Sequence, residues 1–228
     1  MAPPIDEEPR PRLDRKAEGP SWPQADVVHR FAPTLPAPTR TFFEVLDARR
    51  SRSGIDLSLE WLGTILWHAS RLREQRTDGR FGSWESRRPP SAGGIHGLRF
   101  VLLPIGNPGP AGLYDPDGHA LLGLANPVQA AELAANLLGD MGLPQKGWFA
   151  QVIVDIQAYQ SRYDRSDSLI LRDVGALCCM VTLAAEAMGA WSRILGHLDS
   201  GIAGALELGP RYAGAGGLHL TGAEPCAI

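Results

Sequence analysis

The pattern of apolar and polar positions predicts helices in three parts of the chain. After Ser58 they recur every three to four residues up to Ala69, and this predicts a helix capped by Ser58. Thr41 and Glu44 form a capping box, which predicts a shorter helix before it. A long segment, residues 168–189, is apolar on most faces and predicts a central buried helix.

Strand patterns lie between these helices. Residues 98–105 form an apolar run bounded by Gly and Pro, residues 147–157 alternate in part, and residues 217–222 resemble a short last strand. Helices and strands mix without a βαβ rhythm, which argues against a doubly wound parallel sheet. We therefore predict an α+β fold with an antiparallel-type central sheet, flanking helices and a long buried helix.

The remaining segments predict helix ends, turns and loops. Asn126 precedes a proline and predicts a helix start, Gly139 is placed to end that helix, and Asp199 is placed to cap a short later one. Residues 71–88 hold six arginines and little apolar content, so we predict a surface loop, with a lid as the alternative. Residues 189–196 predict a tight turn into a buried edge.

Proline divides the chain into two regions. Nine of the 19 prolines lie in residues 1–40, where repeated proline disfavours regular structure. We predict an extended N-terminal arm there, followed by one domain over residues 41–228. Trp22, Phe31 and Leu35 suggest that the second half of the arm lies along a surface.

Composition excludes several functional classes. The net charge of −3 over 228 residues disfavours binding to nucleic acid. The start of the chain lacks the apolar region of a secretory signal, and the most apolar stretch, residues 174–185, is too short to span a bilayer. Three cysteines do not make a disulfide framework. We expect a cytoplasmic protein that does not enter membranes.

Common catalytic signatures are absent. The sequence has no P-loop, no pair of His or Cys residues at zinc spacing, and no dinucleotide fingerprint in a strand-to-helix context. No metal site is predicted.

Three short motifs could carry chemistry. Arg49-Arg50-Ser51 follows a predicted helix, and guanidinium groups with a hydroxyl suit a phosphate, although a solvated basic turn has the same composition. Residues 90–94 are small, which lets a flat ring or an anion approach the backbone, although a plain turn looks similar. Arg162-Tyr163 places a phenol beside a cation, as in an acid/base pair, although an ordinary arginine and tyrosine at the surface have the same sequence.

In their order, these motifs resemble those of the nitroreductase superfamily. The sequence reads RRS, then RRPPSAGGIH, GLYDPDGHAL and RY, and finally LRDVGALCCMVTLAAEAMGAWSRILG. Within that superfamily it is most similar to the SagB-type dehydrogenases, which oxidise azolines on ribosomal peptides to thiazoles and oxazoles. The resemblance covers roughly residues 35–222.

The resemblance implies an FMN-dependent oxidoreductase whose cofactor lies in a homodimer interface. Arg49, Arg50 and Ser51 would hold the phosphate and ribityl end. The turn at Leu195 and Gly196 would cover one side of the ring system. The segment beside the isoalloxazine would be Pro90, Ser91, Ala92, Gly93 and Gly94.

The same resemblance assigns the chemistry. Tyr163 would be the base that removes a proton, with Arg162 favouring its phenolate, while a hydride passes to the flavin. The substrate would be an azoline or a related heterocycle or amide, as a small molecule or on a peptide. Two alternatives stay open: an NAD(P)H-dependent nitro or quinone reductase, and a flavin-poor relative that acts as a binding or partner protein.

Several positions depart from the family pattern. Ser53 stands where relatives have Arg or Lys near the flavin pyrimidine, and Arg52 is the candidate substitute. Cys179 and Met180 stand where many relatives have Gln and Asn, which suggests packing in place of hydrogen bonding to a ligand.

Overall fold

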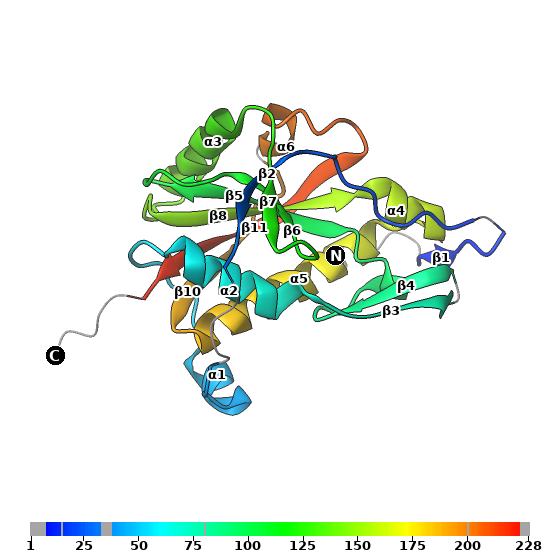
Figure 1. Cartoon of the computed structure of the whole chain (residues 1–228), viewed down its shortest axis with the longest axis horizontal. Coiled ribbons are helices and arrows are strands. Elements are labelled where there is room, and N and C mark those ends of the chain that lie inside the picture. The colour runs from blue at the N-terminus through cyan, green and yellow to red at the C-terminus, as the bar shows by residue number, and fades with distance from the viewer. Residues whose placement is uncertain (1–7, 15, 33–37, 80, 200, 224–228) are drawn as a thin grey trace, which may run out of the picture.

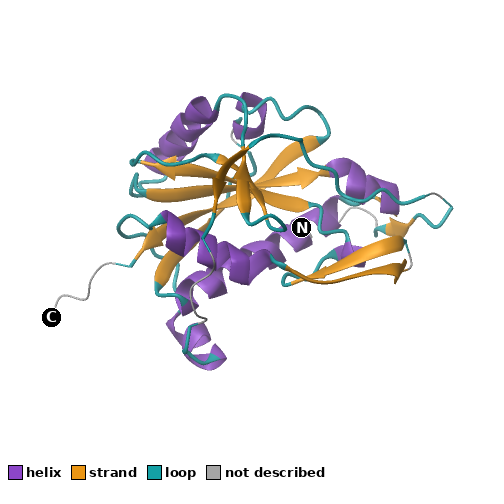
Figure 2. Ribbon diagram, in the orientation of Figure 1, coloured by secondary structure: helices purple, strands orange, loops and turns teal. Residues whose placement is uncertain are grey.

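The chain folds around one twisted antiparallel sheet with helices on both faces (Figures 1 and 2). The computed structural model describes residues 8–14, 16–32, 38–79, 81–199 and 201–223. The strands are β1 (Arg10–Pro11), β2 (Val27–Arg30), β3 (Leu72–Gly79), β4 (Gly82–Arg87), β5 (Leu98–Ile105), β6 (Gly112–Asp115), β7 (Ala120–Leu122), β8 (Gly147–Asp155), β9 (Tyr163–Asp164), β10 (Ala190–Leu195) and β11 (Tyr212–Gly222). The helices are α1 (Phe42–Ala48), α2 (Leu59–Ser70), α3 (Pro127–Asp140), α4 (Ile156–Arg162), α5 (Asp167–Ala187) and α6 (Ile202–Ala205).

The main sheet has seven strands in the order β10-β11-β8-β5-β6-β7-β2, and every neighbouring pair is antiparallel. This confirms the α+β class and the antiparallel sheet. Every residue of the central strand β8 is buried, because helices cover both faces of the sheet. A strand covered on both faces loses the alternation that marks a half-exposed strand, which explains why β8 alternates only in part.

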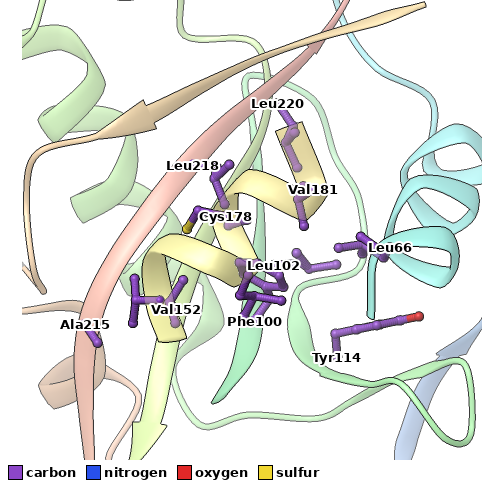
Figure 3. Close-up of a cluster of buried hydrophobic side chains, with 14 of the residues drawn as sticks. Leu66, Phe100, Leu102, Tyr114, Val152, Cys178, Val181, Ala215, Leu218 and Leu220 are labelled. Atoms are coloured by element: carbon purple, nitrogen blue, oxygen red, sulfur yellow. The ribbon is translucent and has the colours of Figure 1, made fainter. Parts of the chain in front are cut away.

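Two apolar cores lie on opposite faces of the sheet. On one face α2 and α5 pack against the sheet, and Figure 3 shows Leu66, Cys178 and Val181 meeting Leu102 and Leu220 there. On the other face α3 and α6 cover β5, β8 and the end of β10. The long helix is therefore a core helix as predicted, since ten of its 21 residues are buried.

The local helix signals of the sequence are confirmed at two helices. Thr41 caps α1, and the reciprocal bonds with Glu44 complete the capping box. The Ser58 hydroxyl accepts from the backbone N–H of Trp61 at the start of α2.

Two predictions about irregular segments are wrong. Residues 71–88 form the β3–β4 hairpin, and β3 is exposed along almost its whole length, so the apolar pattern of a half-buried strand is missing. Residues 190–195 form the edge strand β10 and not a tight turn. The last strand is also longer than predicted, because Tyr212–Gly222 pairs with β8 and β10 across several glycines.

Helix ends differ in detail from the prediction. Asn126 stands at the N-cap of α3 with φ +46°, but its side chain donates to Glu207 and to the Ala205 carbonyl instead of capping the helix. The helix continues past Gly139 and ends at Asp140. Helix α4 was not predicted; the Asp155 carboxylate accepts from the Ala158 N–H at its start.

The N-terminal segment runs across the body. Strand β2 pairs with β7 at the edge of the main sheet, and Phe31 contacts Gly63 of α2. Trp22 stacks on Tyr212 with a ring-centroid distance of 5.7 Å. Leu35 lies outside the described residues. The boundary between the arm and the domain stays a prediction.

Helix α5 extends the apolar stretch to 21 residues. By length and composition it is the one helix of the described chain that could cross a membrane, which corrects the expectation from the shorter stretch. Its contacts with α2, β10 and β11 account for the apolar composition, as in the core helix of a globular fold.

Candidate functional site

Asp173 of α5 fixes the small-residue bend at residues 90–94. Its carboxylate accepts from the Ser91 hydroxyl at 2.5 Å and from the Ala92 N–H at 3.0 Å. The Tyr159 hydroxyl of α4 donates to the same carboxylate at 2.8 Å. Burial, and then the charge of Asp173, raises the pKa of Tyr159 well above its ordinary value, so the phenol stays a hydrogen-bond donor. Asp173 and Tyr159 were not singled out from the sequence.

The predicted catalytic pair meets the same bend. The guanidinium of Arg162 donates to the Gly93 carbonyl oxygen at 3.0 Å. Gly93 has φ +56°, and a Cβ atom there would lie 2.7 Å from the hydroxyl oxygen of Tyr163. The structure therefore brings Arg162, Tyr163 and Gly93 together, although they are about 70 residues apart in the chain.

The tip of the β3–β4 hairpin closes over this pair. The Phe81 ring lies edge-on to Tyr163 at 5.5 Å, and the Arg162 guanidinium lies 5.7 Å from the Phe81 ring centroid. Burial lowers the pKa of Arg162, while Tyr163 and Glu85 act in the opposite direction. An arginine remains charged even with a depressed pKa, so a buried cation stands beside a half-buried phenol.

A cavity of about 180 Å³ opens next to the bend. Polar side chains from several parts of the chain line it, including Arg87, His96 and Tyr159, and Trp22 of the N-terminal segment forms part of its wall. The His96 Nε2 lies 2.8 Å from the Glu85 carbonyl oxygen and must donate to it, which leaves Nδ1 as an acceptor. Burial lowers the pKa of His96 and favours this neutral form.

The arginine–serine motif lies against the edge strand β10. Ser51 forms a parallel bridge with Ser192, and the Arg52 N–H donates to the Ser192 carbonyl. Arg193 of β10 donates to the Ser51 carbonyl at 3.3 Å. Its Nε is buried without a partner among the described residues. Arg193 therefore joins Arg49 and Arg50 in one basic corner, which the sequence did not reveal because they are 143 residues apart.

The Ser53 side chain faces a histidine. Its hydroxyl lies 3.2 Å from Nδ1 of His219, whose Nε2 donates to the Lys146 carbonyl at 2.7 Å. Since Nε2 donates, Nδ1 accepts from Ser53. The Arg52 guanidinium lies 5.4 Å from the Trp191 ring centroid.

The basic corner suits the phosphate of FMN, whereas the bend has few free hydrogen-bond donors to offer the flavin ring. The basic corner offers several cations and an unpartnered buried N–H, which is the chemistry a phosphate needs. At the bend, the Ser91 hydroxyl and the Ala92 N–H are already bonded to Asp173. Pro90, Gly93 and Gly94 contribute small side chains or none, which lets a flat ring approach the backbone there. Leu195, the last residue of β10, packs its side chain into the core with α6, so this end of β10 could offer only the backbone at Gly196.

The bend and the residues just before α1 contact different parts of α5. Asp173, which holds the bend, and Glu186, which binds Arg40 just before α1, are 13 residues apart on α5. At a rise of 1.5 Å per residue this is about 20 Å along the helix. In Figure 1 the β3–β4 hairpin and α1 lie near opposite ends of α5. Among the described residues no cluster of three or more His, Cys, Asp or Glu could hold a metal ion.

Solved structures of other proteins share this architecture. A structure described as that of a nitroreductase from Ralstonia eutropha JMP134 superposes with a TM-score of 0.65 over 92% of this chain and 99% of its own, at 19% identity. The chain has the nitroreductase-like fold. The Escherichia coli microcin synthetase McbBCD complex with a truncated pro-MccB17 bound gives a TM-score of 0.59, 17% identity and 86% and 77% coverage.

A third similar structure contains a flavin. A nitroreductase of Desulfovibrio desulfuricans in complex with FMN covers 83% of this chain and 92% of its own, with a TM-score of 0.50 and 16% identity. In sequence, no family model and no curated protein matches the chain. The likeness therefore establishes the fold, while the assignment of activity depends on the site.

Proposed function

We propose that this protein is an FMN-dependent oxidoreductase that dehydrogenates an azoline or a related heterocycle, as a small molecule or within a peptide. The observation that carries the proposal is the meeting of Arg162, Tyr163 and Gly93 at one bend of a nitroreductase-like fold. The likeness to the microcin synthetase complex, which was solved with a peptide bound, supports a peptide as substrate.

The proposed chemistry divides the two hydrogens of the substrate. Oxidation of an azoline ring to an azole removes one hydrogen as a proton and the other as a hydride. Tyr163 is the proposed base for the proton, and the adjacent guanidinium of Arg162 is its proposed counter-charge. FMN, when bound, would supply the hydride acceptor. Arg162 also orients the bend through the Gly93 carbonyl.

The proposed cofactor site is shared between two copies of the chain. The basic corner of one copy and the bend of the other would meet across a two-fold axis. Helix α1 supports this arrangement: it has seven residues and exposes Phe42, Phe43 and Leu46 while burying only Val45. So short a helix with so much exposed apolar surface needs a partner.

The visible absorption spectrum of the purified protein tests the proposal. We expect a flavin spectrum at about one FMN per chain. Arg50→Ala and Arg193→Ala, combined in one variant, should weaken FMN binding at least about tenfold, because each substitution removes a proposed charged contact to the phosphate. Arg30→Ala on β2 is the control, because it lies at the opposite edge of the sheet. A colourless protein that rejects added FMN would contradict the proposal and favour a flavin-poor binding or partner protein.

The second candidate is an NAD(P)H-dependent nitro or quinone reductase on the same scaffold, favoured by the full-length likeness to the Ralstonia protein. Stopped-flow mixing separates the two. Rapid bleaching of the flavin by NAD(P)H supports the reductase, and bleaching by an azoline substrate alone supports the dehydrogenase.

A further inference from the structure

Three arginines converge at the base of the β3–β4 hairpin. Arg71 is the residue between α2 and β3, and Arg88 follows β4. Leu72 pairs with Arg87 in the antiparallel ladder, so the next pair outward is Arg71 with Arg88. Arg73 lies in the bulge that follows Leu72 on β3.

The positive charge at this base is not balanced by the hairpin's own acids. Glu74 pairs with Arg76, while Glu85 and Asp117 both pair with Arg87. Within the described part of the chain, Arg71, Arg73 and Arg88 form no ion pair. Like charges placed opposite each other across a ladder repel, so holding these three arginines together lowers the stability of the fold.

The details of Arg88 and Arg71 suit an anion. The Nε of Arg88 is buried and has no acceptor among the described residues. Burial lowers the pKa of Arg88, and the nearby charges of Arg71 and Arg73 lower it further. The Arg71 guanidinium lies 5.4 Å from the Trp67 ring centroid, which holds it in place. A dianion bound here would accept a hydrogen bond from the unpartnered N–H of Arg88 and would offset the repulsion between the three guanidinium groups.

We propose that Arg71, Arg73 and Arg88 form a binding site for the phosphate group of a small-molecule ligand. Phosphate matches a cluster of guanidinium forks in charge and geometry. The site is separate from the basic corner at Arg49 and Arg193, because that corner lies against β10 while the β3–β4 hairpin forms its own two-stranded sheet (Figure 1). Only Pro89 separates Arg88 from the bend that begins at Pro90, so a ligand anchored here would lie close to the proposed flavin site.

Calorimetric titration of the full chain with inorganic pyrophosphate tests the site without any flavin. We expect saturable binding that weakens at least tenfold in Arg88→Gln, while Arg76→Gln, on the same hairpin but paired with Glu74, binds like the wild type. Arg88→Gln should also melt at a higher temperature than the wild type in phosphate-free buffer, because it relieves the repulsion. Absence of saturable binding, or equal loss in both variants, would overturn the proposal.

The source of the phosphate is distinguished by two further titrations. NADP⁺ binding at least tenfold tighter than NAD⁺, with the difference lost in Arg88→Gln, supports the site with a dinucleotide 2′-phosphate as its ligand. Equal binding of the two, alongside saturable pyrophosphate binding, supports the site with another phosphate compound. These readouts do not depend on flavin, so the site can stand or fall separately from the proposed function.

Discussion

The Ser91 hydroxyl donates a 2.5 Å hydrogen bond to the carboxylate of Asp173, which lies 82 residues later on α5. The same carboxylate accepts from a backbone N–H and from Tyr159, so one buried side chain holds a loop, a short helix and the long helix in register. Hydrogen bonds from several donors offset the free-energy cost of burying this carboxylate.

Asp173→Asn tests this arrangement. The amide keeps one acceptor oxygen but turns an NH₂ group toward donors, so we expect the free energy of unfolding to fall by about 2–3 kcal/mol. Urea denaturation measures the change. Asp140→Asn, at the exposed end of α3, is the control and should change stability by less than about 0.5 kcal/mol. Equal effects of the two substitutions would show that Asp173 does not organise the bend.

Gly93→Ala tests the contact between the bend and Tyr163. The substitution combines the cost of a side chain at φ +56° with a Cβ 2.7 Å from the Tyr163 hydroxyl oxygen. Gly189→Ala is a matched control, because Gly189 has φ +74° but open space around its Cβ position. We expect Gly189→Ala to cost about 1–2 kcal/mol and Gly93→Ala to cost more and to displace Tyr163. Thermal unfolding measures the loss of stability in the two variants, and tyrosine fluorescence reports the displacement of Tyr163. An equal loss of stability in the two variants would contradict the prediction.

Tyr163→Phe tests the proposed base. Phenylalanine keeps the ring against Phe81 but removes the hydroxyl, so the turnover of an azoline substrate should fall about 10²–10⁴-fold with FMN content unchanged. Tyr212→Phe is the control; its hydroxyl donates to the Ser21 carbonyl and not to the bend. Steady-state rates and the flavin spectrum of both variants decide the matter, and undiminished turnover in Tyr163→Phe would remove Tyr163 from the chemistry.

Stability should depend on pH through buried His219. Burial lowers the pKa of His219 below 6.5, against a smaller opposing effect of its bond to Lys146. Since the unfolded chain binds this proton more readily, the free energy of unfolding decreases as the pH falls from about 7.5 toward and below 6.5. Thermal melts at pH 7.5 and 5.5 measure the loss, and His219→Gln should show a smaller one. An unchanged loss in the variant would mean that other groups account for it.

Phe43→Glu tests the proposed two-fold assembly. Phe43 is 74% exposed on α1, and a charge there should favour monomers and lower FMN affinity at the same time. Val128→Glu on α3 is the control, because Val128 is equally exposed, at 71%, but lies on the side of the sheet opposite α5. Light scattering and FMN titration measure both effects. A wild-type chain that is monomeric at micromolar concentration would contradict the shared site.

Local signals in the sequence predicted the parts of the fold that local physics decides. Capping by Thr41 and Ser58 and the apolar run of α5 depend on neighbouring residues, and they were read correctly. The β3–β4 hairpin was missed, since its strands stand apart from the main sheet and lack an apolar face. Edge strand β10 was missed because glycines flank it.

The candidate site was predictable only in its separate motifs. Arg162, Tyr163 and the bend were singled out, and the structure brings them together. Asp173 and Arg193 were not, because each acts through a contact over more than 80 residues of chain, and no spacing rule connects such partners.

Strand β2 gives the N-terminal segment a structural role that a proline-rich composition conceals. Its hydrogen bonds protect the outer edge of β7, and the residues before it supply Trp22 to the cavity wall. Trimming the chain back to residue 40 for expression would strip that cover, leaving an unpaired strand open to self-association and the cavity without one side. Recombinant versions of this protein should therefore keep the segment that begins near Arg12, where side-chain bonds first tie it to α4.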